Sequence, residues 1–269
     1  MVVFHRSMAG SSNARESFYT RKLEPLHSEI ELLGDLVSDP DIETPRNVNR
    51  VKRAFDLLFA ITAMIFVSPL LLIAAIVIKL ESPGPIFFAQ ERIGLNRRRR
   101  DRRGMAGECG LNRRANFDRR KNLHAGRPFK IYKLRTMRTD AEESGPKLAQ
   151  KNDPRITRAG NLLRKTRIDE IPQFLNVIKG EMSIVGPRPE RSFFINQIRN
   201  EVPEFPLRLR VKPGITGLAQ VEDGYTQTLD MMKRKLMFDL RYISQFSLFH
   251  EIRILFKTVF VVFTGKGAC

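Results

Sequence analysis

Two adjacent acidic residues, Asp169 and Glu170, offer the clearest candidate chemistry in this sequence. They follow a short basic run that contains Arg164, Lys165 and Arg167. Guanidinium groups beside a carboxylate favour its charged form, so we expect both acids to have lowered pKa values and to stay ionised. An ionised aspartate among cations that hold phosphate oxygens suits nucleophilic attack on a phosphoryl group. A solvated helix face, on which acids and bases offset each other, is the alternative interpretation.

The residues around the acid pair predict a helical segment followed by a rigid loop. Apolar residues recur at roughly helical spacing from Leu162 to Ile178, and Pro172 interrupts this pattern. Further along, the tetrapeptide GPRP at residues 186–189 places Arg188 between two prolines. Proline fixes the backbone angle φ, so we expect Arg188 to lie on a loop with little conformational freedom.

Residues 54–78 form the longest apolar run and predict a membrane segment. As a straight helix they would reach ~37 Å, enough to cross a bilayer. Ser68 and Pro69 lie near the middle, where proline kinks a helix and a neighbouring serine can bond the freed carbonyl. Both flanks are basic, so the positive-inside tendency places both ends in the cytoplasm. This pattern favours a kinked, re-entrant helix over a single span, and a buried core helix is the third interpretation.

A strand carrying three cations is predicted over residues 129–137, FKIYKLRTM, which alternate in polarity. We expect it to pair with a strand around Phe87. Lys130, Lys133 and Arg135 are expected to share one face of this strand. Such a row of cations suits either an anion-binding site or an ordinary solvated surface.

The formal net charge of +18 predicts an anionic partner, such as nucleic acid, anionic lipid or a phosphorylated substrate. Much of this charge lies in an insertion at residues 97–125, where the stretch Arg97–Lys121 contains 11 bases and 3 acids. A flexible loop, a membrane-surface patch and a nucleic-acid patch are all compatible with that composition. Cys109 and Cys269 lie far apart, which argues against a disulfide framework and a structural zinc site. Since no P-loop or GxGxxG motif occurs, nucleotide recognition would depend on arginines and glycine-bearing loops.

The two ends of the chain have contrasting compositions. Residues 24–43 contain seven acids, no lysine or arginine and only short apolar groups, so we expect residues 1–50 to form a poorly ordered acidic tail. Residues 246–263 carry apolar side chains at three-to-four spacing, opposite a polar side. This pattern predicts an amphipathic helix at the membrane interface, with a core helix as the alternative. Residues 211–221, VKPGITGLAQV, are expected to form a rigid loop whose backbone approaches a ligand closely.

The sequence resembles the bacterial sugar transferases, the monotopic polyprenyl-phosphate phosphoglycosyl transferase family. The resemblance extends from Val51 to Gly265 and is strongest in the string IDEIPQ followed by GEMSIVGPRP. Other matching segments are KRAFDLLFA, VSPLLLIAAIVIKLESPGPIFFAQERIG, GRPFKIYKLRTM, DPRITRAGNLLRKTR and VKPGITGLAQV. In the family only a few residues usually join the two strands, whereas this chain has the basic insertion there.

The resemblance implies transfer of a phospho-sugar from a UDP-sugar to undecaprenyl phosphate, with release of UMP. This reaction initiates exopolysaccharide, capsule or glycoconjugate synthesis. It implies Mg²⁺ and a covalent aspartyl-phosphosugar intermediate, with Asp169 as nucleophile, Glu170 assisting it and both as metal ligands. Ser68 and Pro69 would be the family's helix break. The residues implied to bind substrate are Lys133, Arg135, Arg164, Pro187, Arg188 and Pro189.

The predicted fold is therefore α+β and mostly α, with a compact cytoplasmic catalytic domain over residues 82–269. A re-entrant membrane helix at residues 51–81 and a C-terminal interfacial helix are expected to hold it on the bacterial inner membrane. The expected partners are the UDP-sugar donor, the polyprenyl phosphate acceptor, the membrane and possible polysaccharide-assembly proteins, with no nucleic acid. The alternative is a membrane-anchored nucleic-acid-binding or scaffold protein that acts through its basic insertion.

Overall fold

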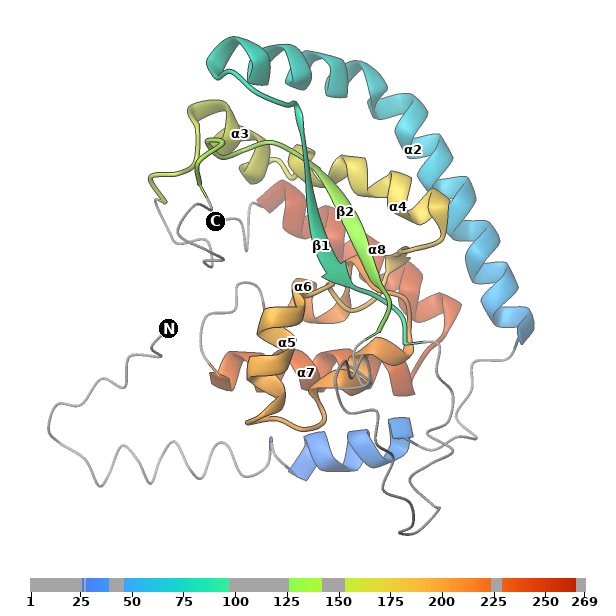
Figure 1. The fold of residues 1–269 in the computed structure, drawn as a ribbon. Helices are drawn as coiled ribbons and strands as arrows, with labels where there is room; N and C mark the ends of the chain where they lie inside the picture. The colour runs from blue at the N-terminus through green and yellow to red at the C-terminus, as the bar shows by residue number, and fades with distance from the viewer. Residues whose placement is uncertain are drawn as a thin grey trace, which may run out of the picture.

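A computed structural model describes residues 26, 28–38, 46–96, 126–141, 153–223 and 229–264 (Figure 1). Within these residues helices predominate, together with two small two-stranded sheets, which agrees with the predicted mostly helical α+β class. The basic insertion at residues 97–125 lies outside the described part. The helices and strands are, in chain order, α2 (Arg46–Glu81), β1 (Phe87–Ile93), β2 (Pro128–Leu134), α3 (Arg158–Lys165), η1 (Ile168–Gln173), α4 (Phe174–Lys179), β3 (Ser183–Val185), α5 (Ser192–Arg199), η2 (Phe205–Arg210), β4 (Gly214–Thr216), α6 (Leu218–Glu222), α7 (Leu229–Ser244) and α8 (Leu248–Thr264).

The apolar run forms one continuous helix, α2, which bends over the rest of the molecule in Figure 1. Pro69 lies inside it and has no N–H to offer the carbonyl of Ile65, four residues earlier. Ser68 Oγ donates to that carbonyl at 2.8 Å, which confirms the predicted compensation by the neighbouring serine. Asn49–Glu81 is the stretch, among the described residues, that is long and apolar enough to cross a membrane. Only 11% of its most apolar window is buried inside the molecule.

The first turns of α2 are fastened to the centre of the molecule by charged side chains. Asp56 is 2% exposed, and its Oδ1 accepts hydrogen bonds from Ser183 Oγ at 3.1 Å and Ile184 N at 3.0 Å. Arg53 donates to two carbonyls in the last turn of α4, where the negative end of the helix favours a cation. These contacts hold α2 against α4 and β3.

The far end of α2 returns to the same body. Glu81 accepts hydrogen bonds from the backbone N–H groups of Arg158 at 2.7 Å and Ala159 at 3.0 Å, so it caps the start of α3. Arg135, just after β2, donates to the carbonyl of Ser82 at 2.7 Å and to that of Pro83 at 2.8 Å. Both ends of the apolar helix therefore contact elements that directly precede the acid pair and the GPRP loop.

Strands β1 and β2 pair antiparallel, with Phe87 opposite Leu134, as predicted. The expectation that three cations share one face of β2 is wrong. Lys130 and Lys133 are three residues apart, and side chains of a strand alternate between its faces, so these two lysines point to opposite sides. Lys130 is exposed, whereas Lys133 reaches η1.

The glycine-bearing loop after residue 211 becomes strand β4, which pairs parallel with β3. A Cβ added to Gly214 would lie 2.1 Å from the backbone nitrogen of Gly186, and one on Gly217 would lie 2.3 Å from the carbonyl oxygen of Gly186. The glycines thus let two backbone segments touch each other. The close approach expected toward a ligand is in fact made within the protein.

Part of the expected N-terminal tail is packed, contrary to the prediction for residues 1–50. Residues 28–38 are helical and lie beneath α7 in Figure 1. Ile30 and Val37 are each 1% exposed and belong to a core cluster with Phe205 and Leu236. The spacing of seven residues puts both side chains on one face of a helix, a signal that the acidic composition of the segment masked.

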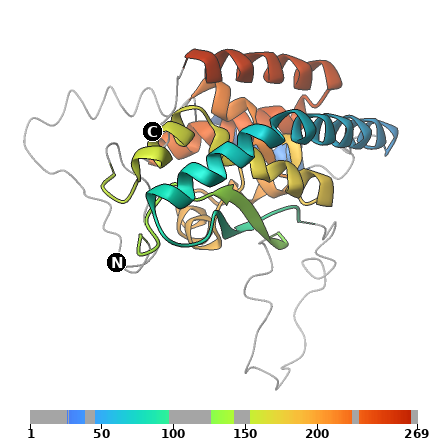
Figure 2. The ribbon, with the colours of Figure 1, turned by 90° about the horizontal axis from the view of Figure 1, so that it is seen from above.

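Helix α8 buries polar side chains together with Ile254 and exposes most of its large apolar side chains. Glu251 is 1% exposed and accepts a hydrogen bond from Tyr242 Oη at 2.7 Å, and Thr258 Oγ1 lies 2.7 Å from Thr216 Oγ1. Figure 2 shows α8 at the edge of the molecule. Its outer side exposes large apolar side chains, including Phe249, Ile252, Phe256, Val259 and Phe260. This exposed apolar side is compatible with the predicted helix at the membrane interface, which stays a prediction.

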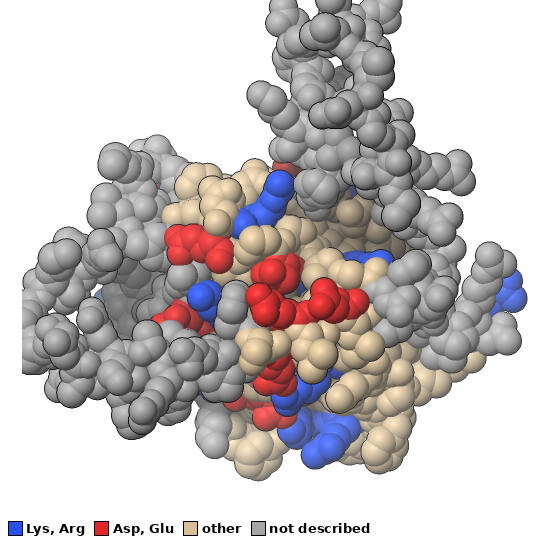
Figure 3. Space-filling model, turned by 90° about the horizontal axis from the view of Figure 1, so that it is seen from below, with Lys and Arg blue, Asp and Glu red and all other residues tan. Residues whose placement is uncertain are grey.

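The two ends of the molecule differ in character. Large apolar side chains of α2 are exposed along most of the helix, among them Leu58, Ile65, Phe66, Leu72 and Leu80. The opposite end, drawn in Figure 3, presents acidic and basic side chains among uncharged ones. An exposed apolar surface of this extent marks a contact with a membrane or another protein.

Replacing Asp56 tests whether its buried carboxylate fastens α2 to β3. Asp56→Ala leaves the Ser183 hydroxyl and the Ile184 N–H buried without an acceptor, at about 1–3 kcal/mol each. We expect the melting temperature of detergent-solubilised protein to fall by several degrees. Asp140→Ala, at an exposed acid, is the control and should leave it unchanged. Equal melting temperatures for the two variants would contradict the fastening role.

Candidate active site

Glu170 lies at the centre of a charged cluster that joins three segments. Lys133 Nζ, from β2, donates a hydrogen bond to Glu170 Oε1 at 2.7 Å. Arg188, from the loop after β3, donates from both terminal nitrogens, with Nη1 at 3.2 Å from Oε2 and Nη2 on Oε1. This paired arrangement matches the fork of a guanidinium group to the two oxygens of a carboxylate. β2, η1 and the GPRP loop therefore meet at one side chain.

The cations decide the charge state of Glu170. Burial by itself would raise the pKa of Glu170, but the charges of Arg188 and Lys133 and their hydrogen bonds hold it well below its usual range. In return, the charge of Glu170 raises the pKa of Arg188. Burial lowers the pKa of Lys133, against the opposing effect of Glu170. Glu170 is thus ionised at neutral pH, as predicted.

Asp169 lies beside this cluster with its carboxylate unpaired. The residue is 6% exposed, and no described residue donates a hydrogen bond to its carboxylate. Burial is the largest influence and raises the pKa of Asp169; Lys133 opposes the shift, and the charge of Glu170 adds to it. The predicted lowered pKa is therefore wrong for Asp169. A carboxylate with a raised pKa and no hydrogen-bond donors is a more basic and more reactive oxygen nucleophile.

A left-handed residue turns the chain from α3 into the acid pair. Thr157 caps the start of α3 by accepting a hydrogen bond from Gly160 N at 2.9 Å, and Thr166 Oγ1 donates to Leu162 O at 2.8 Å near its end. Arg167 then adopts φ 59°, the one positive φ at a non-glycine residue among those described. A conformation of this kind costs about 1–3 kcal/mol and tends to occur at functional sites. It starts η1 and places both acids in the buried interior.

Asn176, which sequence reasoning missed, positions the strand that carries Lys133. Its amide is fully buried and pairs with β2 as another strand would. Oδ1 accepts from Tyr132 N at 3.2 Å, and Nδ2 donates to Lys130 O at 2.7 Å. β2 is thereby held against α4, and Lys133 toward η1. The only sequence signal was a polar residue inside an apolar helical pattern.

The other predicted substrate-binding residues occupy different places. Arg164, on α3, donates to Thr136 Oγ1 at 2.9 Å, and its charge is one of those that lower the pKa of Asp169. Arg135 is 6% exposed and is engaged with the turn after α2, so the structure gives it an anchoring contact away from the acid pair. Pro187 and Pro189 flank Arg188 and line a small pocket behind it.

The two acids are of a residue type that magnesium accepts as ligand, and a Mg²⁺ site at this pair stays a prediction. Mg²⁺ in such sites takes one or two carboxylates, substrate phosphate oxygens and water. Asp169 has a buried carboxylate that no described residue pairs, and Glu170 is adjacent to it. Within the described residues no group of three or more acidic, histidine or cysteine side chains suits a metal. The remaining ligands would have to come from substrate and water.

Isosteric substitutions of the two acids should affect the stability of the folded protein differently at pH 7. Glu170→Gln removes the charge that Arg188 and Lys133 share, and should lower the free energy of unfolding by about 1–3 kcal/mol. Asp169→Asn removes a carboxylate whose ionisation is disfavoured by burial, so its melting temperature should equal or exceed that of the native protein. Scanning fluorimetry measures both.

The effect of Glu170→Gln should also depend on pH. Because the folded-state pKa of Glu170 is lowered, its stabilisation is fully present above the unfolded-state value of about 4.3. It is lost as the pH falls through the folded-state pKa. The native and Glu170→Gln curves should therefore approach each other only in that acidic range. Equal destabilisation by both isosteres at pH 7 would contradict the different roles of the two acids.

Comparison with known proteins places the chain in a family. The model of a family described as "Bacterial sugar transferase" matches residues 47–101 and 112–265. The chain is 39% identical over 247 residues to a UDP-N-acetylgalactosamine-undecaprenyl-phosphate N-acetylgalactosaminephosphotransferase of Aeromonas hydrophila, covering 92% of this chain and 50% of the relative. It is 38% identical over 247 residues to a UDP-glucose:undecaprenyl-phosphate glucose-1-phosphate transferase of Escherichia coli (strain K12), covering 90% and 47%.

A shorter relative matches along nearly its whole length. The exopolysaccharide production protein PSS of Rhizobium leguminosarum bv. phaseoli is 38% identical over 227 residues, covering 81% of this chain and 98% of the relative. The chain spans about half the length of the first two relatives. Since the family model covers most of the sequence, including the acid pair and the GPRP loop, the chain belongs to the bacterial sugar transferase family.

Proposed function

We propose that this protein transfers a phospho-sugar from a UDP-sugar to undecaprenyl phosphate and releases UMP. The observation that carries the proposal is the pairing pattern of the two acids. Glu170 holds both Lys133 and Arg188, whereas the buried carboxylate of Asp169 is left without a hydrogen-bond donor among the described residues. One acid is fixed, and its neighbour is available for reaction.

The reaction proceeds in two substitutions at one phosphorus atom. An oxygen of Asp169 attacks the phosphorus that bears the sugar, the bond from that phosphorus to the bridging oxygen breaks, and UMP leaves with the electron pair. An oxygen of the lipid phosphate then attacks the same phosphorus. The bond between phosphorus and Asp169 breaks, which restores the carboxylate and yields the lipid diphosphate sugar. Two steps allow the nucleotide to depart before the acceptor engages.

The cations of the site make this approach of anions possible. A carboxylate, a diphosphate and a lipid phosphate repel one another unless positive charge lies between them. Lys133 and Arg188 stand next to the acid pair, and Arg164 acts on Asp169, so these three are the side chains proposed to hold phosphate oxygens. A Mg²⁺ bound by Asp169 and Glu170 would neutralise further charge on the transferred phosphoryl group.

The donor sugar belongs among those named for the relatives. Proteins similar to this chain are named for the transfer of glucose 1-phosphate or N-acetylgalactosamine phosphate. UDP-glucose and UDP-N-acetylgalactosamine are therefore the first donors to test. The product would serve as the lipid-linked start of an exopolysaccharide, and the relative from Rhizobium is itself named for exopolysaccharide production.

We also propose that α2 enters and leaves the membrane on the same side. Both of its ends contact one body, through Asp56 at the start and Glu81 at the end. A straight span would carry those ends to opposite faces of the bilayer, ~30 Å apart. The outward apolar side of α8 would lie in the interface. In this arrangement the protein lies on the bacterial inner membrane with its catalytic residues in the cytoplasm, where a soluble donor meets a lipid acceptor.

The reaction is tested with purified protein in nanodiscs, Mg²⁺, undecaprenyl phosphate and a panel of UDP-sugars. We expect the native protein to release UMP with one donor, and Asp169→Asn to reduce the rate at least 100-fold, because its amide is not a nucleophile. Asp140→Asn, at an exposed acid, is the control and should keep the native rate. UMP release by Asp169→Asn at the native rate would overturn the assigned nucleophile. No release from any donor by folded native protein would overturn the reaction.

The covalent step has its own test, without the lipid acceptor. With a donor labelled in the phosphate next to the sugar, native protein should retain label after denaturation, and Asp169→Asn should not. Hydroxylamine should remove the label, since it cleaves acyl phosphates. Label that persists in Asp169→Asn would place the intermediate elsewhere or exclude it.

The path of α2 is tested by cysteine labelling in sealed vesicles of known orientation. Cys109 and Cys269 are first replaced by serine, and Arg50→Cys and Pro85→Cys are made separately, at exposed positions before and after the apolar stretch. We expect a membrane-impermeant maleimide to reach both positions from the same side. Labelling from opposite sides would show that α2 spans the bilayer.

A further inference from the structure

A second charged cluster lies behind the GPRP loop, and the proposed chemistry does not use it. Its centre is Arg208 of η2, whose side chain is 2% exposed. Arg208 Nη2 lies 2.7 Å from Asp239 Oδ2 on α7, and Arg208 Nη1 lies 3.7 Å from Glu190 Oε1. Lys235 of α7 also donates a hydrogen bond to Glu190. Charges buried this deeply are costly, so a cluster of them calls for an explanation beyond packing.

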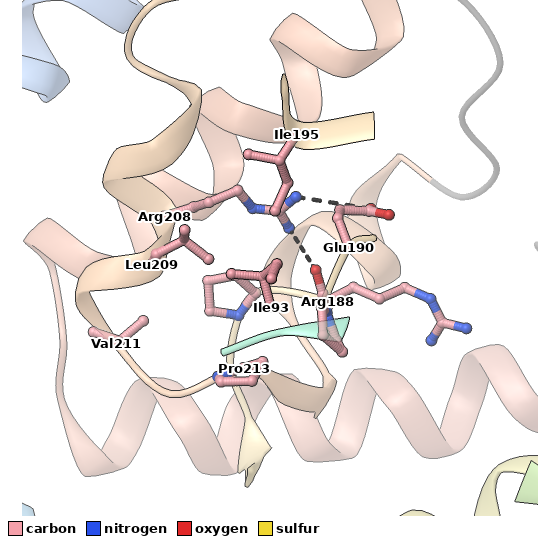
Figure 4. Close-up of a pocket in the computed structure, with 10 residues that line it drawn as sticks. Ile93, Arg188, Glu190, Ile195, Arg208, Leu209, Val211 and Pro213 are labelled. Atoms are coloured by element: carbon pink, nitrogen blue, oxygen red, sulfur yellow. Dashed lines mark hydrogen bonds and ion pairs between the residues drawn. The ribbon is translucent and has the colours of Figure 1, made fainter. Parts of the chain in front are cut away.

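The cluster reaches the backbone of the loop that carries Arg188. Arg208 Nη2 donates to the carbonyl oxygen of Arg188 at 2.8 Å (Figure 4). In the same view the side chain of Arg188 points away from Arg208. Arg208 therefore touches the main chain of Arg188 and not its guanidinium group. The contact fixes the position of the Arg188 backbone, from which the side chain extends to Glu170.

The neighbouring carbonyls of the loop are held as well. Each accepts a hydrogen bond from a different donor: Pro187 O from Gly214 N at 3.0 Å, Pro189 O from Arg92 Nη1 at 3.1 Å and Glu190 O from Ile93 N at 2.9 Å. Proline has a fixed φ, so two of the four residues at positions 187–190 have little backbone freedom of their own. The donor at Arg188 itself is the buried Arg208. Removing that donor would free the middle of the loop while leaving its flanks attached.

Arg208 has several partners at once, which explains why position 208 holds an arginine. Burial would raise the pKa of Glu190, but Lys235, Arg208 and Arg92 lower it to about 2. Arg208 thus lies close to the carboxylates of Glu190 and Asp239 and donates to a loop carbonyl. Its guanidinium also lies 4.9 Å from the ring centre of Phe205. A planar group with five donors can do this. A lysine ammonium keeps the charge but lacks the fork.

We propose that Arg208 is a positioning residue for the transfer reaction, which holds the backbone of Arg188 so that the Arg188 guanidinium is in place on Glu170 before substrate binds. The expected effect of Arg208 on the transfer rate rests on the proposed function. Its effect on the position of Arg188 rests on geometry alone. The substrate-binding side chain is thereby preorganised by a residue that touches neither substrate nor acid pair.

The kinetic test compares Arg208→Lys with Arg241→Lys. Arg241 is also an arginine paired with an acid, Glu29, but on the surface of α7. For Arg208→Lys we expect kcat for UMP release to fall at least tenfold, with a smaller change in KM for the donor. Arg241→Lys should keep the native kcat and KM.

A double-mutant cycle provides a readout that needs no activity. Arg188→Ala deletes the side chain on Glu170 but keeps the carbonyl that Arg208 contacts. If Arg208 positions that side chain, Arg188→Ala should lower the melting temperature in the native background and lower it much less in the Arg208→Lys background.

The outcomes separate the inference from the proposed function. Native kcat and KM in folded Arg208→Lys, or additive changes of melting temperature in the cycle, would overturn the positioning role. An inactive native protein would overturn the transfer reaction, and the cycle would still decide whether Arg208 positions Arg188.

Discussion

Two adjacent carboxylates in a nearly closed site impose the main physical constraint on this structure. Two buried carboxylates cannot both be ionised unless positive charge lies close by. In this structure two cations of the site both bind the same carboxylate. Lys133 and Arg188 pair with Glu170, so Glu170 stays ionised and immobile. The charges of Lys133 and Arg188 act on the pKa of Asp169, although neither side chain is hydrogen-bonded to it. The difference between the two neighbouring acids thus comes from which of them is hydrogen-bonded to the cations.

The elements that support this pair are also those that meet the apolar helix. α2 contacts β3 through Asp56, just before the GPRP loop, and caps α3 through Glu81, just before the acid pair. Arg135 ties the turn after α2 to the end of β2. The position of α2 and the geometry of the charged site are therefore connected through direct contacts. A shift of either end of α2 would move a segment that leads directly into the acid pair or the GPRP loop.

Buried polar and charged contacts lie beside the apolar core clusters in the rest of the described structure. Glu251 of α8 is buried beside Tyr242, and the charges of Arg208, Asp239 and Glu190 lie behind the loop. The apolar core clusters and these polar contacts together hold the elements, while α2 and α8 expose large apolar side chains of the kind that contact a membrane or another protein.

The sequence by itself determined the adjacent acid pair, the cation on the GPRP loop, the long apolar helix with its proline, the β1–β2 pair and the apolar face of α8. These depend on residue type, local spacing and proline, which act over a few residues. Tertiary structure alone decided the rest. Whether a carboxylate has a raised or a lowered pKa depends on burial and on partners 18 and 37 residues away, such as Arg188 and Lys133. The parts played by Asn176 and Arg208, the anchoring contact of Arg135 and the packing of residues 28–38 likewise follow from contacts that only the folded chain creates.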